Sequence, residues 1–261
     1  MEFELLGPVG VRHVPITSAQ QRSILAVLLL EAGRVVSVDR LVDLLWDGDH
    51  MPRRARNVVQ VNVSALRRKL GPARCLTHKP PGYVLQVPRP QIDLHHFRAQ
   101  VTTIRSTATD PGVRARMLRR ALDIWQGDPL ADADAPGLAP VRRALAEERL
   151  AVLEECLAAE SHTGLCTQSI AELRVLVAAH PLRERLSALL MLALYRGGRP
   201  ADALQVFHDT RRALADETGT EPGPELRAVY EQVLRHDPVL EQPGRPAIAD
   251  RPGWAEPGIS R

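Results

Sequence analysis

The sequence predicts an α+β domain at the N-terminus, followed by an all-α array of helices. Three observations lead to this prediction. β-like runs occur only before residue 90, and from Asp93 onward apolar residues recur with helical spacing alone. The charge changes at the same place, because residues 1–90 carry a net +6 and residues 91–261 a net −3. We therefore expect domains at 1–90 and 91–237, with a disordered Pro/Gly-rich tail at 238–261.

Capping and turn residues set the order of elements in the first domain. Ser18 and Ser37 stand directly before apolar runs, where a serine side chain accepts a hydrogen bond from a free backbone amide of the helix. The run Lys79–Gly82 separates two β-like segments, which predicts a hairpin. The expected elements are two strands within residues 2–15, a helix over 18–32, a strand at 35–36, helices over 38–46 and 56–71, and the hairpin around 79–82.

A repeat of 34 residues organises part of the second domain. Gly164 and Gly198 are 34 residues apart, as are Leu173 and Phe207, and each glycine separates two amphipathic helices. This period and helix-turn-helix unit are typical of tetratricopeptide-like repeats. Small Ala203 would let neighbouring helices approach. The helices are expected over residues 94–105, 112–126, 137–162, 166–179, 184–196, 200–215 and 223–235.

The helix expected over residues 56–71 (RNVVQVNVSALRRKLG) has two distinct faces. One is an ordinary core stripe, formed by Val59, Val63, Leu66 and Leu70. The other is small and uncharged apart from its arginines, where a solvated face would carry Glu and Lys. Either this helix is packed on both sides, or forms a dimer contact, or it enters the major groove of DNA, which excludes bulk and repels negative charge. The residues expected to face bases are Asn57, Val58, Val61, Ser64, Ala65, Arg67 and Arg68.

The charge around this helix favours DNA. Between His50 and Ile92 the sequence has nine Arg and Lys residues and no Asp or Glu. Ordinary protein surfaces mix both signs, so this run indicates a polyanion as partner. The basic hairpin after the helix predicts a winged helix, whose wing would bring Thr77, His78 and Lys79 to the adjacent DNA backbone.

The chain resembles a known family in both parts. Four segments resemble the OmpR-type winged helix, and more narrowly that of the Streptomyces antibiotic regulatory protein (AfsR-like) family: QQRSILAVLLLEAGR (20–34), VVSVDRLVDLLW (35–46), ARNVVQVNVSALRRKLG (55–71) and PPGYV (80–84). Three further segments resemble that family's bacterial transcriptional activator domain: DLHHF (93–97), HPLRERLSALLMLALYRGGR (180–199) and EPGPELRAVY (221–230).

The resemblance implies a fold and a function. The fold is an α+β N-terminal winged helix-turn-helix followed by an all-α tetratricopeptide-like helical array. The function is that of a transcriptional activator, a homodimer on direct repeats of promoter DNA that recruits RNA polymerase through its sigma subunit and controls a specialised-metabolite (antibiotic) gene cluster.

The resemblance also implies roles for single residues. Trp46 would reach a phosphate and Tyr83 would pack the wing onto the core, whereas Ala65 stands where relatives often carry a groove-reading arginine. With the basic residues, the expected phosphate contacts are Trp46, Arg53, Arg54, Arg56, Lys69, Thr77, His78 and Lys79.

The sequence offers no sign of catalysis. No phosphate-binding loop, dinucleotide fingerprint, nucleophile elbow or zinc-protease motif is present, so we expect no enzyme and no cofactor. His95-His96 lacks a third metal ligand, and Glu147-Glu148 and Glu154-Glu155 read as solvated pairs on a long helix. The remaining alternative is a helical adaptor whose basic domain binds any polyanion.

The expected location is the cytoplasm. No apolar run approaches the about 20 residues that cross a bilayer, and the N-terminus has no signal-peptide pattern. Three cysteines without C-x-x-C spacing are expected to be reduced thiols. We therefore expect a cytoplasmic, nucleoid-associated protein that makes no membrane contact.

Overall fold

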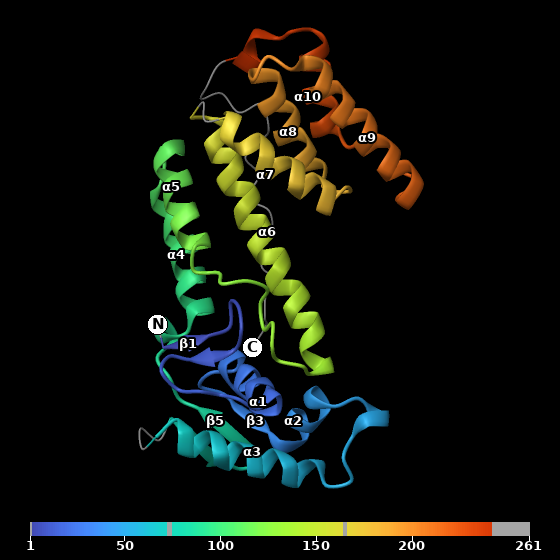
Figure 1. The fold of residues 1–261 in the computed structure, drawn as a ribbon. Coiled ribbons are helices and arrows are strands. Elements are labelled where there is room, and N and C mark those ends of the chain that lie inside the picture. The colour runs from blue at the N-terminus through green and yellow to red at the C-terminus, as the bar shows by residue number, and fades with distance from the viewer. Residues whose placement is uncertain (1, 72–74, 164–165, 242–261) are drawn as a thin grey trace. The chain divides into compact units, whose positions relative to one another are not determined.

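The computed structural model describes residues 2–71, 75–163 and 166–241 (Figure 1). The chain divides into two compact units, one made of residues 1–107 and 117–153 and the other of residues 108–116 and 154–261. The first unit thus contains the expected DNA-binding segment together with the helical segments that follow it. The division into domains at residue 90, which the sequence suggests, stays a prediction.

The first unit begins with the elements that the sequence predicts, in the predicted order. Both serine caps are confirmed, because the side chains of Ser18 and Ser37 accept hydrogen bonds from the amides of Gln21 and Arg40. The elements are β1 (Phe3–Glu4), β2 (Gly10–Val11), α1 (Ala19–Leu30), β3 (Val35–Ser37), α2 (Val38–Leu45), the 3-10 turn η1 (Gly48–His50), α3 (Ala55–Lys69), β4 (Leu76–Lys79) and β5 (Gly82–Leu85).

The winged-helix core lies between three helices and a small sheet. Helices α1, α2 and α3 pack against one another, and α1 also packs on β5 (Figure 1). The sheet is antiparallel with the strand order β3-β5-β4. Gly82 is required where β5 begins, because a Cβ there would collide with the carbonyl oxygen of Val36 on β3. Tyr83, the next residue, pairs with Val36 in the register and is buried.

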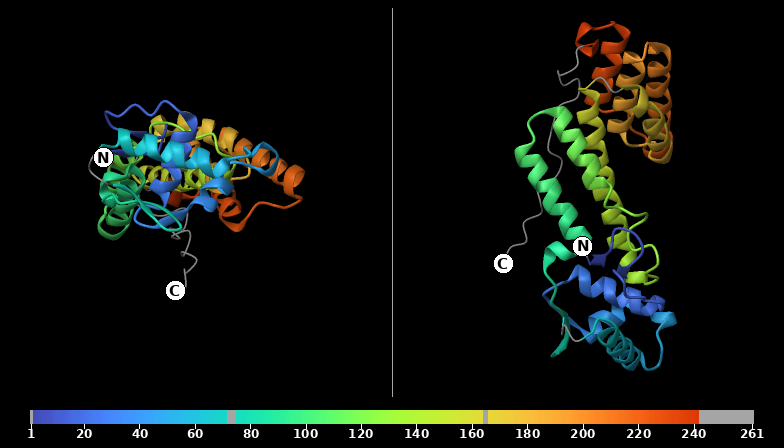
Figure 2. Two further views of the ribbon diagram at one scale, coloured as in Figure 1. Left: turned by 90° about the horizontal axis from the view of Figure 1, so that it is seen from below. Right: turned by 60° about the vertical axis from the view of Figure 1, so that its left-hand side comes forward.

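Helical segments complete the first unit (Figure 2), and Arg98 of α4 pairs there with Glu148 of the first part of α6 at 2.7 Å. Asp93 opens α4, and its buried carboxylate accepts hydrogen bonds from the amides of Leu5, Leu6 and Leu94 at 2.6–2.9 Å. It thereby joins α4 to the chain that follows β1. The elements are η2 (Arg89–Gln91), α4 (Asp93–Thr107), α5 (Pro111–Leu122), η3 (Pro136–Leu138) and α6 (Ala139–Ser161), of which α5 and α6 continue into the second unit.

Helix α5 ends four residues earlier than the sequence predicts. After Leu122 the chain turns, and the Trp125 ring meets the Phe97 ring edge to face at 5.4 Å. The amide of Gln126 then donates to the carbonyl of Leu6 at 2.7 Å. These contacts with distant residues end the helix, so its C-terminus could not be read from local periodicity.

The second unit contains the helical repeats, with α8 packed against α7, α9 and α10. Leu173 and Phe207, the positions 34 residues apart, are both buried, and Ala203 is fully buried between helices. The predicted bounds hold closely. The elements are α7 (Cys166–Ala179), α8 (Glu184–Arg196), α9 (Pro200–Thr218), α10 (Pro224–Leu234) and the 3-10 turn η4 (Pro238–Glu241).

Two expectations about this unit were wrong. The tail does not begin at residue 238, because residues 238–241 form η4, Leu240 is fully buried and its carbonyl accepts from Arg196 Nε at 2.7 Å. Residues 242–261 lie outside the described residues. Glu154 is not solvated either, since it is 7% exposed and pairs with Arg183 at 3.1 Å. Burial raises the pKa of the Glu154 carboxyl.

Candidate nucleic-acid interface

Helix α3 has the two faces that its sequence predicts. Val59, Val63 and Leu66 are at most 1% exposed and face α1 and α2, whereas Leu70 at the end of the stripe is half-buried. The mutual packing of α1, α2 and α3 therefore fixes which side of α3 is presented to solvent. Core formation therefore decides which side of α3 is open to a partner.

The presented face of α3 is small and carries no acid. Asn57, Val61, Ser64 and Arg68 are exposed at its centre, and Val61 is 60% exposed. Val58 and Ala65 are half-buried at one edge of the face. Exposing a valine this far gains nothing for folding, but its methyl groups are suited to contact thymine methyls in a major groove.

Gln60 is a polar residue of this helix that the sequence analysis missed. Gln60 is exposed. The Ser64 hydroxyl donates to the backbone carbonyl of Gln60 at 2.8 Å, and not to its side-chain amide. A glutamine amide can bind an adenine edge with two hydrogen bonds. The signal in the sequence was its position four residues before Ser64, on the same side of a helix.

Four cations around α3 are exposed and make neither an ion pair nor a side-chain hydrogen bond among the described residues: Arg53, Arg54, Arg68 and Lys79. Arg53 and Arg54 lie directly before α3, and Arg68 lies on its last turn. Arg56 differs from them, because its guanidinium pairs with Asp39 in the first turn of α2 at 2.7 Å.

Two predicted contacts are engaged within the chain. Arg67 Nε donates to the carbonyl of Leu76 at 2.9 Å, so this arginine joins the end of α3 to the hairpin. Lys69 Nζ donates to the carbonyl of Pro15 at 3.1 Å. Arg67 and Lys69 are therefore hydrogen-bonded within the chain, whereas Arg68 is exposed to solvent.

The hairpin β4–β5 supplies the wing. His78 and Lys79 are exposed and Thr77 is half-buried. Tyr83 is 7% exposed, and the His78 ring meets its ring edge to face at 5.4 Å, so the wing is packed onto the core as predicted. Trp46, which follows α2, is half-exposed.

The described part of the chain shows neither a metal-binding cluster nor a membrane-spanning helix. No group of three or more His, Cys, Asp and Glu side chains in it could hold a metal ion. Its helices also include none that is long and apolar enough to cross a bilayer. The arrangement on α3 and the wing can hold a polyanion through its cations and present hydrogen-bonding and methyl groups between them.

Family models match both parts of the chain. The model described as the C-terminal domain of transcriptional regulatory proteins matches residues 13–85, and the model of the bacterial transcriptional activator domain matches residues 92–234. The first match contains the winged helix, and the second contains all the helices from α4 to α10.

Curated relatives and a solved structure agree with these matches. The regulatory protein AfsR of Streptomyces coelicolor is 40% identical over 93% of this chain, and the chain spans only 25% of that relative's length. The transcriptional regulator RedD of the same organism is 36% identical, with 93% of this chain and 73% of RedD covered. The regulatory protein DnrI of Streptomyces peucetius is 32% identical, with 94% and 96% covered.

The solved structure is that of Mycobacterium tuberculosis EmbR in complex with a low-affinity phosphopeptide. It superposes with a TM-score of 0.82 at 35% identity and covers 90% of this chain and 65% of EmbR. The predicted fold, a winged helix followed by a tetratricopeptide-like array, is confirmed. With both domain models in this order and regulators of this kind aligned over nearly its whole length, the chain belongs to the Streptomyces antibiotic regulatory protein family of transcriptional regulators.

Proposed function

We propose that this protein is a sequence-specific DNA-binding transcriptional activator that reads promoter DNA with α3. The observation that carries the proposal is the face of α3, which exposes Val61 and Arg68 between small polar residues and has no carboxylate. A major groove about 12 Å wide admits such a helix. The residues proposed to face bases are Asn57, Val58, Val61, Ser64, Ala65, Arg67 and Arg68, joined by Gln60.

Within this set we place Arg68 first. Its guanidinium has no ion pair among the described residues, so both edges are free to bind guanine O6 and N7. Arg67 has one nitrogen occupied by the Leu76 carbonyl, which leaves its terminal nitrogens for a base or a phosphate.

The phosphate contacts proposed are those around the face. Arg53, Arg54 and Arg56 flank the start of α3, and Thr77, His78 and Lys79 extend from the wing. Trp46 and Lys69 complete the set. Such contacts position the helix and do not read sequence.

The family membership supports the rest of the proposal. We infer binding to direct repeats as a homodimer, recruitment of RNA polymerase through its sigma subunit, and control of a specialised-metabolite gene cluster. The helices α7–α10, which form a repeat array of a kind used for protein contacts, are the proposed platform for these protein partners.

A DNase footprint on the promoters that flank this protein's own gene tests the proposal, with an Arg67/Arg68 double-alanine variant as control. Protected direct repeats spaced by about one helical turn, lost in the variant, are expected. Diffuse protection that disappears at moderate salt and is the same in the variant would contradict it. The chain would then be a helical adaptor that binds polyanions without reading sequence.

A further inference from the structure

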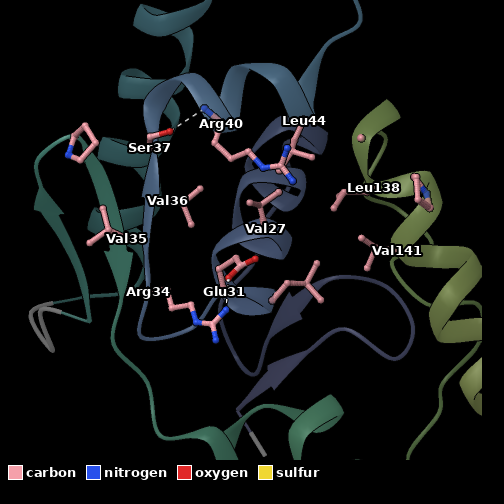
Figure 3. Close-up of a pocket in the computed structure, with 14 residues that line it drawn as sticks. Val27, Glu31, Arg34, Val35, Val36, Ser37, Arg40, Leu44, Leu138 and Val141 are labelled. Carbon is pink, nitrogen blue, oxygen red and sulfur yellow. Dashed lines mark hydrogen bonds and ion pairs between the residues drawn. The ribbon is translucent and has the colours of Figure 1, made fainter. Parts of the chain in front are cut away.

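A cavity of about 750 Å³ lies in the first unit (Figure 3), and no residue of α3 lines it. Its walls come from α1, β3 and α2 on one side and from η3 and the start of α6 on the other. The cavity has the size of known small-molecule sites, which range from about 300 to 1,000 Å³. The proposed DNA contacts use none of its lining residues.

The interior of the cavity is apolar. Val27, Val36 and Leu138 are at most 4% exposed and direct their side chains toward it in Figure 3. Leu44 and Val141 are half-buried on opposite walls. Part of the apolar surface of Leu44 and Val141 is still exposed, and a hydrophobic occupant would bury it.

The two walls are held in place by direct contact. A Cβ built at Gly137 would lie 2.6 Å from Leu44 Cα, so the backbone of η3 rests on α2. The segment before η3 is tied to α1, because Arg22 pairs with Asp132 at 2.9 Å. A site whose walls are already fixed loses little conformational entropy when it binds a ligand.

The charge at the mouth selects the kind of ligand. Arg40 extends from α2 over the cavity and makes no ion pair among the described residues (Figure 3). Arg34 lies at the mouth with Glu31, the single acid of the lining, at 3.7 Å, and both side chains are largely exposed. Two guanidinium groups against one carboxylate give the mouth a net positive charge, and a guanidinium binds a carboxylate or sulfonate through two parallel hydrogen bonds.

We propose that this cavity binds a small amphipathic anion, with its apolar body between α1, α2 and η3 and its acidic group at the mouth on Arg40. The proposal rests on the shape, the apolar interior and the uncompensated charge of the cavity. It concerns no residue of the DNA interface, so it stands or falls separately from DNA binding.

Fluorescence titration of the full chain with anilinonaphthalene sulfonate, an aromatic body with one sulfonate group, tests the proposal without DNA. Saturable binding at one site is expected. Arg40→Gln should weaken it about tenfold, because one charge-assisted contact is lost. Arg120→Gln, at an exposed arginine of α5 in the same unit, is the matched control and should leave binding unchanged.

A second variant tests the apolar interior. Val141→Trp fills the cavity from its half-exposed wall and should lower binding at least about tenfold, whereas Val113→Trp at an exposed valine of α5 should not. Thermal melting shows whether each variant is folded. Decanoate should displace the probe, and uncharged decanol should do so far less well. Binding that both cavity variants leave intact, or equal displacement by decanoate and decanol, would overturn the proposal.

Discussion

Arginines in two regions of this molecule have different surroundings. Around α3, Arg54 and Arg68 are exposed without an ion pair among the described residues. In the helical region, arginines pair with acids at short distances, as Arg211 does with Glu221 at 2.8 Å and Arg183 with Glu154 at 3.1 Å. A paired charge contributes to the fold and weakens the external field, whereas an unpaired one is available to a partner. The same residue type thus serves stability in one region and, as we propose, recognition in the other.

The largest effect is expected from breaking the buried pair of the helical region. Arg183→Ala removes the 3.1 Å partner of the buried Glu154 carboxylate and leaves Arg185 as the positive charge that acts on it. Since Arg183 is partly exposed, we expect a loss of about 3 kcal/mol in the free energy of unfolding, at the lower end for buried pairs. Urea denaturation measures this loss. Specific DNA affinity of the folded fraction should not change.

The pH dependence of the same variant provides its control. Burial raises the pKa of Glu154, so this carboxyl contributes stability that is fully present below its unfolded pKa of about 4.3 and is lost as the pH rises through its folded pKa. The damage from Arg183→Ala should therefore be greater near neutral pH than at acidic pH. Adding Glu154→Gln should recover part of the loss at neutral pH, and no recovery would contradict a stranded charge as the cause.

Removing an unpaired arginine should weaken DNA binding and leave the free energy of unfolding almost unchanged. Arg68→Ala should weaken binding to the operator by about 1–3 kcal/mol if Arg68 reads a base. The free energy of unfolding should change by no more than about 0.5 kcal/mol. A mobility-shift titration on operator and scrambled DNA measures the difference.

Arg211→Ala, which breaks an exposed pair of the helical region, is the matched variant for Arg68→Ala and should not change DNA affinity. If Arg68→Ala weakens binding equally on both DNAs, Arg68 contacts a phosphate and its assignment to a base is wrong.

A smaller effect is expected in the salt dependence of binding. Arg54→Gln should reduce the slope of log affinity against log salt concentration by about 0.9, the value for one phosphate contact. Titrations at a series of salt concentrations measure the slope. Arg235→Gln, at an exposed arginine paired with Glu231, should leave it unaltered. Equal slopes for wild type and Arg54→Gln would remove Arg54 from the interface.

The smallest effect is expected from breaking the ion pair between Arg56 and Asp39. Asp39→Asn removes the 2.7 Å partner of Arg56 and one negative charge near the proposed phosphate contacts. We expect DNA affinity to rise about twofold, because exposed pairs are worth less than about 1 kcal/mol. Asp202→Asn, which breaks a comparable pair between Asp202 of α9 and Arg199 directly before it, should have no effect on affinity. A fall in affinity with Asp39→Asn would show that Asp39 positions Arg56 for binding.

Much of the fold follows from local sequence, because its signals act within a few residues. Ser18 and Ser37 cap the helices that they precede, and the spacing of Val59, Val63 and Leu66 sets the buried side of α3. The side of α3 that faces solvent follows from the same periodicity. Helical spacing alone therefore places Arg68 on the exposed face, while its contact with a base stays a prediction.

Tertiary structure decided what each polar group meets, since its partner lies far along the chain. Periodicity placed Glu154 on a solvated face, but packing against a later helix brings Arg183 to it and buries it. Composition made residues 238–241 part of a disordered tail, yet Arg196 holds the carbonyl of Leu240.

The same division applies to the two candidate sites. The sequence by itself determined that α3 is a basic helix with a small, acid-free face, because charge and periodicity are properties of one segment. Only the tertiary structure decided that Arg67 turns to Leu76 while Arg68 stays free. It also created the cavity beneath Arg40, whose walls are about 100 residues apart in the sequence and meet only where Gly137 rests on Leu44. Contacts of this kind depend on packing in three dimensions, which no local pattern records.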